Sequence, residues 1–250
     1  MFDQKCIIGH RVKTGKGIMG PEAQQKNPER EARILQAAAT LIVHYGYDKT
    51  TVADIAEEAG ISKGAVYLHF ESKEALFQTL LEREILAYSR AWLELIEADQ
   101  QGGTLAGMYK NVLIVMRRFP LMQALFRQDR RVLGSYLKTG PANLNFKLAI
   151  GKDFIAGMQQ VGAIRSDMRP EIVAYIMSML SYALVSMDDV LPPEVIPPTE
   201  EVIEGIALLL DRALSSGDSA GSEAGKQLIR QITQTGLARM QGQETSTTGE

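Results

Sequence analysis

The sequence predicts an all-α protein, and three observations support this. Apolar residues recur every three or four positions through most of the chain from Pro28 onward, which is the spacing of one helix face. No stretch alternates between apolar and polar residues with a period of two, as a half-buried strand would. Pro120, the Gly140-Pro141 pair and the proline-rich run 191–198 separate the helical stretches. We therefore expect helices packed on one another without a sheet.

Composition limits the function less than the fold. The chain has 250 residues, and 27 Lys and Arg against 30 Asp and Glu give a net charge of −3 at pH 7. Nucleic-acid-binding domains usually show a basic excess, so a DNA-binding function has to be argued from local pattern. Cys6 is the only cysteine, which excludes an internal disulfide and a cysteine-rich zinc site. No apolar stretch has the length of a membrane span or of a signal peptide, so we expect a cytoplasmic protein without metal or cofactor.

The chain opens with a segment of weak pattern. Residues 1–26 have little periodicity and several Gly and Lys, as expected of a flexible basic arm. An alternative is that Met19 is the natural start of the protein. The stretch from Pro28 to Tyr45 then predicts the first helix, and Gly46 is placed to end it in a left-handed cap.

Residues 51–70 carry the clearest functional pattern. Thr51 can cap a short helix, with Asp54 as the acid of a capping box. Gly60 can supply the positive φ of a sharp turn, and Ser62 can cap a second short helix. Two short helices joined through a glycine turn have the geometry of a helix-turn-helix. The alternative is a tight helical hairpin inside a core.

In a helix-turn-helix the second helix enters the major groove of DNA. The small residues Gly64 and Ala65 would let the backbone approach the bases, and Lys63 is the candidate for reading a base, with guanine as its expected partner. Tyr67, His69 and Lys73 can donate hydrogen bonds to phosphates. The predicted DNA-binding residues are Thr51, Ser62, Lys63, Gly64, Ala65, Tyr67, His69 and Lys73.

The stretch from Thr50 to Leu76 resembles the DNA-binding signature of the TetR family of transcriptional regulators. The shared landmarks are Ile55-Ala56, Ala59-Gly60-Ile61-Ser62, Gly64, Tyr67, His69-Phe70 and Ser72-Lys73-Glu74. The resemblance covers about residues 28–80. It implies a three-helix DNA-binding head, residues 27–75, on a larger helical body, residues 76–215, that binds a small molecule and forms a homodimer. A two-fold dimer would bind a near-palindromic operator.

The body is expected to be helical up to a flexible end. Its predicted helices are 73–98, 104–118, 121–138, 142–161, 170–188 and 199–214. The last two are apolar on more than one face, so they must be buried by their own core or by a partner chain, and the resemblance implies a dimer contact there. Residues 216–250 are expected to form a flexible linker, a short helix and a disordered tail, with linker composition over 215–225.

Aromatic and methionine side chains gather between residues 92 and 182. Methionine adapts its shape and suits a promiscuous apolar ligand site. The alternative is that most of these residues are ordinary core. The predicted ligand-binding residues are Trp92, Met116, Phe119, Met122, Phe126, Phe154, Met158, Tyr175, Met179 and Tyr182.

The resemblance, together with the aromatic and methionine-rich body, implies a homodimeric repressor that is released from a near-palindromic, double-stranded DNA operator by a small apolar or amphipathic effector. A membrane is not an expected partner. An enzyme is the first alternative, but the sequence has no HExxH motif, phosphate-binding loop or Gly-x-Ser-x-Gly elbow. A non-specific architectural DNA binder is disfavoured by the acidic balance. A helical interaction module that has lost DNA binding is disfavoured by the presence of Lys63, Tyr67, His69 and Lys73.

Overall fold

The computed structural model of the chain describes residues 27–139, 151–187, 190–215 and 220–240. Within these ranges the chain forms helices and no β-strand, apart from one isolated bridge between Ile164 and Ser215. The all-α prediction is therefore confirmed. None of the described helices is long and apolar enough to cross a membrane.

Two predicted segments cannot be compared with the structure. The basic arm, residues 1–26, and the tail, residues 241–250, lie outside the described residues, as does the first part of the predicted helix 142–161. The described part of that helix is α9 (Lys152–Gln160).

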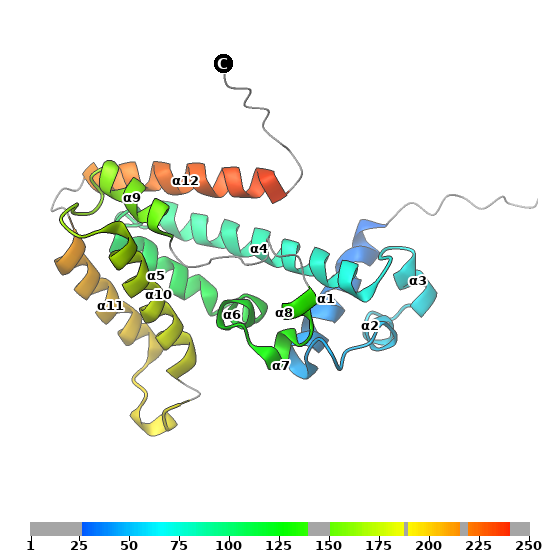
Figure 1. Cartoon of the computed structure of the whole chain (residues 1–250). Helices are drawn as coiled ribbons and strands as arrows, with labels where there is room; N and C mark the ends of the chain where they lie inside the picture. Colours follow the sequence, from blue (N-terminus) through cyan, green and yellow to red (C-terminus); the bar gives the residue numbers. More distant parts are fainter. Residues whose placement is uncertain (1–26, 140–150, 188–189, 216–219, 241–250) are drawn as a thin grey trace, which may run out of the picture.

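The first three helices form the head at one end of the molecule (Figure 1). They are α1 (Pro28–Tyr45), α2 (Val52–Glu58) and α3 (Lys63–Tyr67). Gly46 ends α1, but its φ of 90° and ψ of 155° are not those of the predicted left-handed cap. Its amide still donates to the carbonyl of Ile42 at 2.9 Å, and the next amide, that of Tyr47, donates to the carbonyl of Val132 as the chain enters a turn closed by the Thr50 amide on the Gly46 carbonyl.

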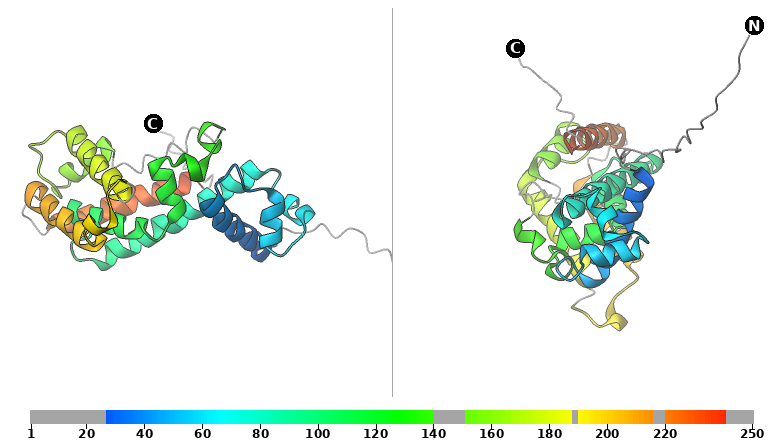
Figure 2. Two further views of the ribbon diagram at one scale, coloured as in Figure 1. Left: turned by 90° about the horizontal axis from the view of Figure 1, so that it is seen from below. Right: turned by 90° about the vertical axis from the view of Figure 1, so that its right-hand side faces the viewer.

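One long helix connects the head to the far end of the body. Helix α4 (Lys73–Ala98) begins beside α3 and runs the length of the molecule, and the head protrudes from one end of the elongated body (Figure 2). Helix α5 (Leu105–Met116) packs on α4, and α11 (Thr199–Leu214) packs on α5. Helix α10 (Pro170–Ser186) packs on α9, and the short 3-10 helix η3 (Pro193–Val195) lies between α10 and α11.

The predicted single helix over residues 121–138 is wrong. The chain instead forms α6 (Pro120–Arg127), α7 (Arg130–Leu133) and α8 (Tyr136–Thr139). Gln128 adopts a left-handed conformation with a φ of 51°, and Asp129 then accepts from the amides of Arg131 and Val132 to start α7. Gly134, with a φ of 53°, ends α7. Local capping thus breaks a segment whose apolar spacing alone indicates one helix.

The predicted linker over residues 215–225 is also wrong from Ala220 onward. Helix α12 (Ala220–Met240) begins there and lies along α4. Ile229 is fully buried in the body core, and Arg230 donates to the Glu97 carboxylate of α4. Because most helical stability comes from tertiary packing and not from propensity, a segment with linker composition can still be helical against α4.

The buried residues form three clusters, and the first of them joins the head to the body. Besides α1 to α4, the head cluster contains residues of α6 to α8, namely Leu121, Ala124, Val132, Leu133 and Tyr136. Packing is therefore continuous across the predicted boundary between residues 75 and 76. The division into a DNA-binding head and a ligand-binding body remains a functional prediction.

Candidate functional site

Local hydrogen bonds fix the two short helices α2 and α3. The Thr51 hydroxyl donates to the Asp54 carboxylate at 2.8 Å and accepts from the Asp54 amide at 3.2 Å, and the Thr51 amide donates to the same carboxylate. These bonds lower the pKa of Asp54. Gly60 turns the chain with a φ of 65°, and the Ser62 hydroxyl accepts from the Ala65 amide at the start of α3. Two capped helices around a glycine turn make a helix-turn-helix.

The outer face of α3 is formed by a small set of exposed residues. Val66 is 1% exposed and anchors the helix on the head core, whereas Lys63, Gly64 and Tyr67 are exposed. The Lys63 ammonium lies 6.0 Å from the centre of the Tyr67 ring. Ala65 is half-buried, and Ser62 is exposed beside its capping bond. The face can offer one cation, one phenol and a stretch of bare backbone to a ligand.

Leu68 also belongs to this face, and the sequence reasoning missed it. It is 57% exposed and lies one helical turn after Gly64, so its apolar side chain projects on the same side of α3 as Gly64. Its position four residues after Gly64 places it on the same helix face, and the sequence contains that signal. An exposed apolar side chain here can contact a thymine methyl group or a sugar ring.

Gly64 has no structural reason to be glycine within the described residues. Its φ is not positive, and a Cβ added to it would meet only the Ser62 hydroxyl oxygen, at 4.0 Å. Alanine favours a helix over glycine by up to about 1 kcal/mol. The absence of a side chain therefore leaves the backbone of α3 exposed at this position, and it does not improve the packing of the protein.

Two predicted phosphate contacts are less available than expected. His69 is 8% exposed and its Nδ1 lies 3.8 Å from the Glu31 carboxylate of α1. Lys73 is half-buried, its ammonium lies 4.1 Å from the centre of the Tyr47 ring, and burial lowers its pKa. Lys73 thus has a partner inside the head, whereas His69 Nδ1 is buried near Glu31 without a hydrogen bond to any described residue, and the contact of both side chains with phosphates stays a prediction.

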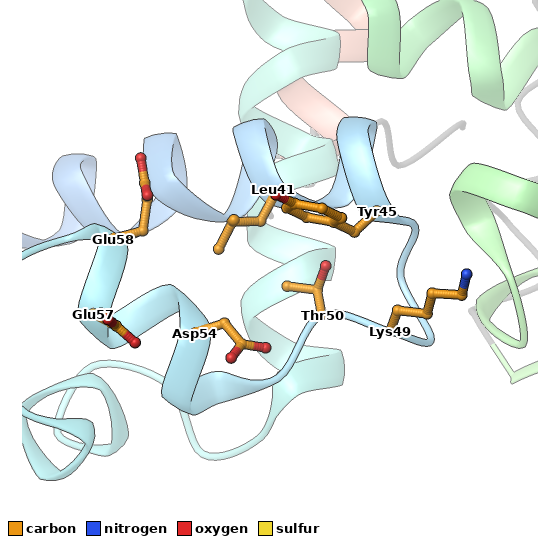
Figure 3. Close-up of a pocket in the computed structure, with 7 residues that line it drawn as sticks. All are labelled: Leu41, Tyr45, Lys49, Thr50, Asp54, Glu57 and Glu58. Atoms are coloured by element: carbon orange, nitrogen blue, oxygen red, sulfur yellow. The ribbon is translucent and has the colours of Figure 1, made fainter.

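An open hollow of about 530 Å³ lies on the other side of the head, between α1 and α2 (Figure 3). Its lining residues are Leu41, Tyr45, Lys49, Thr50, Asp54, Glu57 and Glu58. Three carboxylates make this surface unfavourable for DNA phosphates, and no residue of the predicted DNA-binding or ligand-binding sets lines it. It therefore shares no residue with either predicted site, although Asp54 in its lining accepts hydrogen bonds from Thr51 of the DNA-binding set.

The structure brings together five of the predicted ligand-binding residues. They lie in a compact group between α4, α5 and α6, here called the α4–α6 cluster. Its principal members are the buried Ile85, Tyr88, Val115, Met116 and Met122, with the half-buried Trp92, Phe119 and Phe126 packed on them. Sequence reasoning missed Tyr88, which is 3% exposed and lies one helical turn before Trp92.

Two more of the predicted residues belong to the neighbouring core. Met158 is fully buried and Phe154 half-buried in the larger body cluster, which also includes Tyr109 and Ile229. Trp92 packs against both clusters and its indole nitrogen donates to the Met108 carbonyl at 3.4 Å. Trp92 thus connects the two groups of predicted ligand-binding residues.

The interpretation of Tyr175, Met179 and Tyr182 as lining residues needs correction. They are 68%, 56% and 55% exposed on the outer face of α10, and they belong to none of the buried clusters of the described residues. The reason is that α10 is apolar on two faces, and only one of them packs on the body. Together with exposed neighbours they form what we call the α10–α11 face: Ile172, Tyr175, Ile176, Met179, Tyr182, Leu208 and Leu209.

Comparison with known proteins places this geometry in a family. Residues 34–80 match the sequence profile described as bacterial regulatory proteins, tetR family. The HTH-type transcriptional repressor KstR2 of Rhodococcus jostii is 32% identical over 139 residues, which cover 47% of this chain and 68% of that protein. An uncharacterized HTH-type regulator of Bacillus subtilis, YfiR, is 40% identical over 65 residues. The matches to YfiR and two further B. subtilis regulators span only 25% to 32% of those relatives' lengths.

Solved structures share the fold. The B. subtilis regulator FadR in complex with stearoyl-CoA superposes with a TM-score of 0.54 at 18% identity, covering 72% of this chain and 96% of FadR. The ketosteroid transcriptional regulator KstR2 of Mycobacterium tuberculosis gives 0.52 at 18% identity, with 76% and 97% covered. The relatives are DNA-binding regulators, not enzymes. With its helix-turn-helix, its match to the tetR-family profile and its match over 68% of the repressor KstR2, the chain belongs to the TetR family of bacterial regulatory proteins.

Proposed function

We propose that this protein is a homodimeric transcriptional repressor that binds a near-palindromic operator through α3 and is released by a small apolar or amphipathic effector bound in the body. DNA binding would place it in the cytoplasm. The observation that carries the proposal is the outer face of α3, where Lys63 and Tyr67 stand beside a glycine that the packing of the protein does not require. A close approach of α3 to base edges accounts for that glycine.

A second copy of the chain is the proposed occupant of the α10–α11 face. Tyr175 and Leu209 are 68% and 69% exposed, and helices α10 and α11 lie side by side at the body end (Figures 1 and 2). Soluble monomers rarely leave large contiguous apolar patches in water. A two-fold contact on this face would carry the two heads to successive major grooves, about 34–36 Å apart.

The proposed release passes through α6. Its residues Leu121 and Ala124 belong to the head cluster, while Met122 belongs to the α4–α6 cluster. An effector that rearranges the α4–α6 cluster would therefore also displace the residues of α6 that pack in the head cluster. Release requires that the effector bind more tightly to a conformation whose heads do not fit both half-sites, because it shifts the equilibrium only by that difference in affinity.

The test is selection from a random duplex library with the purified full chain at near-physiological salt. We expect a near-palindromic site with a Kd of about 10⁻⁸ to 10⁻¹¹ M. Lys63→Ala should relax the preference at one base pair of each half-site by about 1–3 kcal/mol and leave the other positions unchanged. Recovery of no motif, with weak binding that disappears as salt rises, would contradict the proposed function.

A further inference from the structure

The Tyr88 hydroxyl is a buried polar group without a partner. Its side chain projects from α4 into the α4–α6 cluster and is 3% exposed. No group of the described residues makes a hydrogen bond with its hydroxyl, and the nearest ring, that of Phe119, packs edge-on at 5.8 Å. Burial raises the pKa of Tyr88, so the group is a neutral phenol that can donate one hydrogen bond.

A second buried tyrosine of the body shows how the fold normally treats such a group. Tyr109 of α5 is fully buried, and its hydroxyl donates to the Met177 carbonyl at 3.2 Å and accepts from the Ser181 hydroxyl at 2.9 Å. Buried polar groups are nearly always paired in this way. Leaving the Tyr88 hydroxyl unpaired is unfavourable, and phenylalanine would fill the same space without that penalty.

The surroundings of Tyr88 suit a small molecule. The principal members of the α4–α6 cluster are apolar apart from the Tyr88 hydroxyl, and Met116 and Met122 can change shape around a guest. Trp92, Phe119 and Phe126 are only half-buried, so the cluster reaches the surface. The Tyr136 hydroxyl and His69 Nδ1 are also without a hydrogen bond to the described residues, but both belong to the head or its cluster. The Tyr136 ring packs on Tyr47 and Phe77 there, and the head cluster contains no methionine.

We propose that Tyr88 is the polar anchor of the effector site and that the effector class is a largely apolar molecule with a carbonyl oxygen. The phenol would donate to that oxygen while the methionine and aromatic side chains enclose the apolar part. This inference rests on the proposed ligand-controlled function and names the chemistry of its effector.

The ligand test uses benzophenone and 1,1-diphenylethylene, which have the same shape but differ in the carbonyl oxygen. Binding to the full chain is measured by calorimetry, and ultraviolet irradiation then attaches benzophenone to carbon atoms that it touches. We expect benzophenone to bind about tenfold more tightly than the hydrocarbon, and its label to appear on peptides that contain Met116 or Met122. In Tyr88→Phe the two affinities should become equal. Equal affinities in the wild type, no benzophenone binding, or a label confined to other peptides would overturn the proposal.

A second measurement needs no ligand. Tyr88→Phe should unfold at the same temperature as the wild type or higher, because it removes an unpaired hydroxyl. The matched variant Tyr109→Phe should unfold at a lower temperature, because it leaves the Ser181 hydroxyl and the Met177 carbonyl without that partner. A comparable loss in both variants would show that the Tyr88 hydroxyl has a structural role.

These measurements separate the inference from the proposed function. Failure to find an operator while benzophenone discriminates as expected would leave a small-molecule site in a protein that is not a sequence-specific regulator. A specific operator without discrimination between the two probes would leave the regulator and remove Tyr88 as its anchor.

Discussion

The head and helices α9 to α11 of the body begin in different ways. Asn27, Thr51, Ser62 and Ser72 each cap the start of α1 to α4 with a side-chain oxygen. Thr104 caps α5 in the same way, but α9, α10 and α11 start without a side-chain cap within the described chain. The head is thus specified by local bonds that a short sequence contains, whereas α9 to α11 depend on what their apolar faces pack against. Four substitutions test this difference.

The largest effect on operator binding is expected from the α10–α11 face. Leu209→Glu places a carboxylate where we propose that a second copy packs, and a buried unpaired charge is strongly unfavourable. The variant should sediment as a monomer at micromolar concentration, and its operator affinity should fall by about 100-fold or more, equivalent to about 2.7 kcal/mol. Ile232→Glu, on an exposed position of α12, is the control and should stay dimeric. A dimeric Leu209→Glu protein would show that the interface lies elsewhere.

Packing should also determine whether α12 holds to α4. Ile229 is fully buried, and Ile229→Ala should lower the free energy of unfolding by about 2–4 kcal/mol in urea titrations. The matched change Ile232→Ala, at a residue that is 45% exposed, should cost far less. Equal effects at the two positions would mean that α12 contributes little to the folded body.

The same contrast explains what the sequence could and could not predict. The capping box of Thr51 and Asp54 and the Gly60 turn are local signals of the sequence, and the structure confirms both. The break of the 121–138 segment follows from Gln128 in a left-handed conformation, which apolar spacing does not reveal. The start of α12 at Ala220 depends on contacts with α4, more than a hundred residues earlier.

Periodicity also could not assign faces within the body. The apolar spacing treats Tyr175 and Met116 alike, although Tyr175 is 68% exposed and Met116 is 5% exposed. Tyr88 was missed because its unpaired hydroxyl exists only when α4, α5 and α6 are packed together.

In the head, Gly64→Ala separates function from stability. The added methyl group meets open space, so the free energy of unfolding should stay the same or rise by up to about 1 kcal/mol. Operator affinity should fall by about tenfold, near 1.4 kcal/mol, because the methyl group holds α3 away from the bases. Gly236→Ala, at another open helical position, should leave operator affinity unchanged. Unaltered binding by Gly64→Ala would remove the close approach from the proposed interface.

The smallest effect concerns the hydrogen bonds between Asp48, in the loop between α1 and α2, and Ser135, between α7 and α8. The Asp48 carboxylate accepts from the hydroxyl and the amide of Ser135, and these bonds lower the pKa of Asp48. A carboxyl group whose pKa is lower in the folded protein contributes stability above its unfolded pKa of about 3.9, and this contribution is lost as the pH falls through the lowered value. Asp48→Asn cannot ionise, so its deficit in unfolding midpoint relative to the wild type should be constant from pH 7 to 5 and shrink below about pH 4. Ser135→Ala keeps the amide donor and should show the same trend with a smaller deficit. A deficit that does not change with pH would mean that the shape of Asp48, and not its charge, holds the loop. The Asp48–Ser135 contact would then depend on packing, as the contacts between the body helices do.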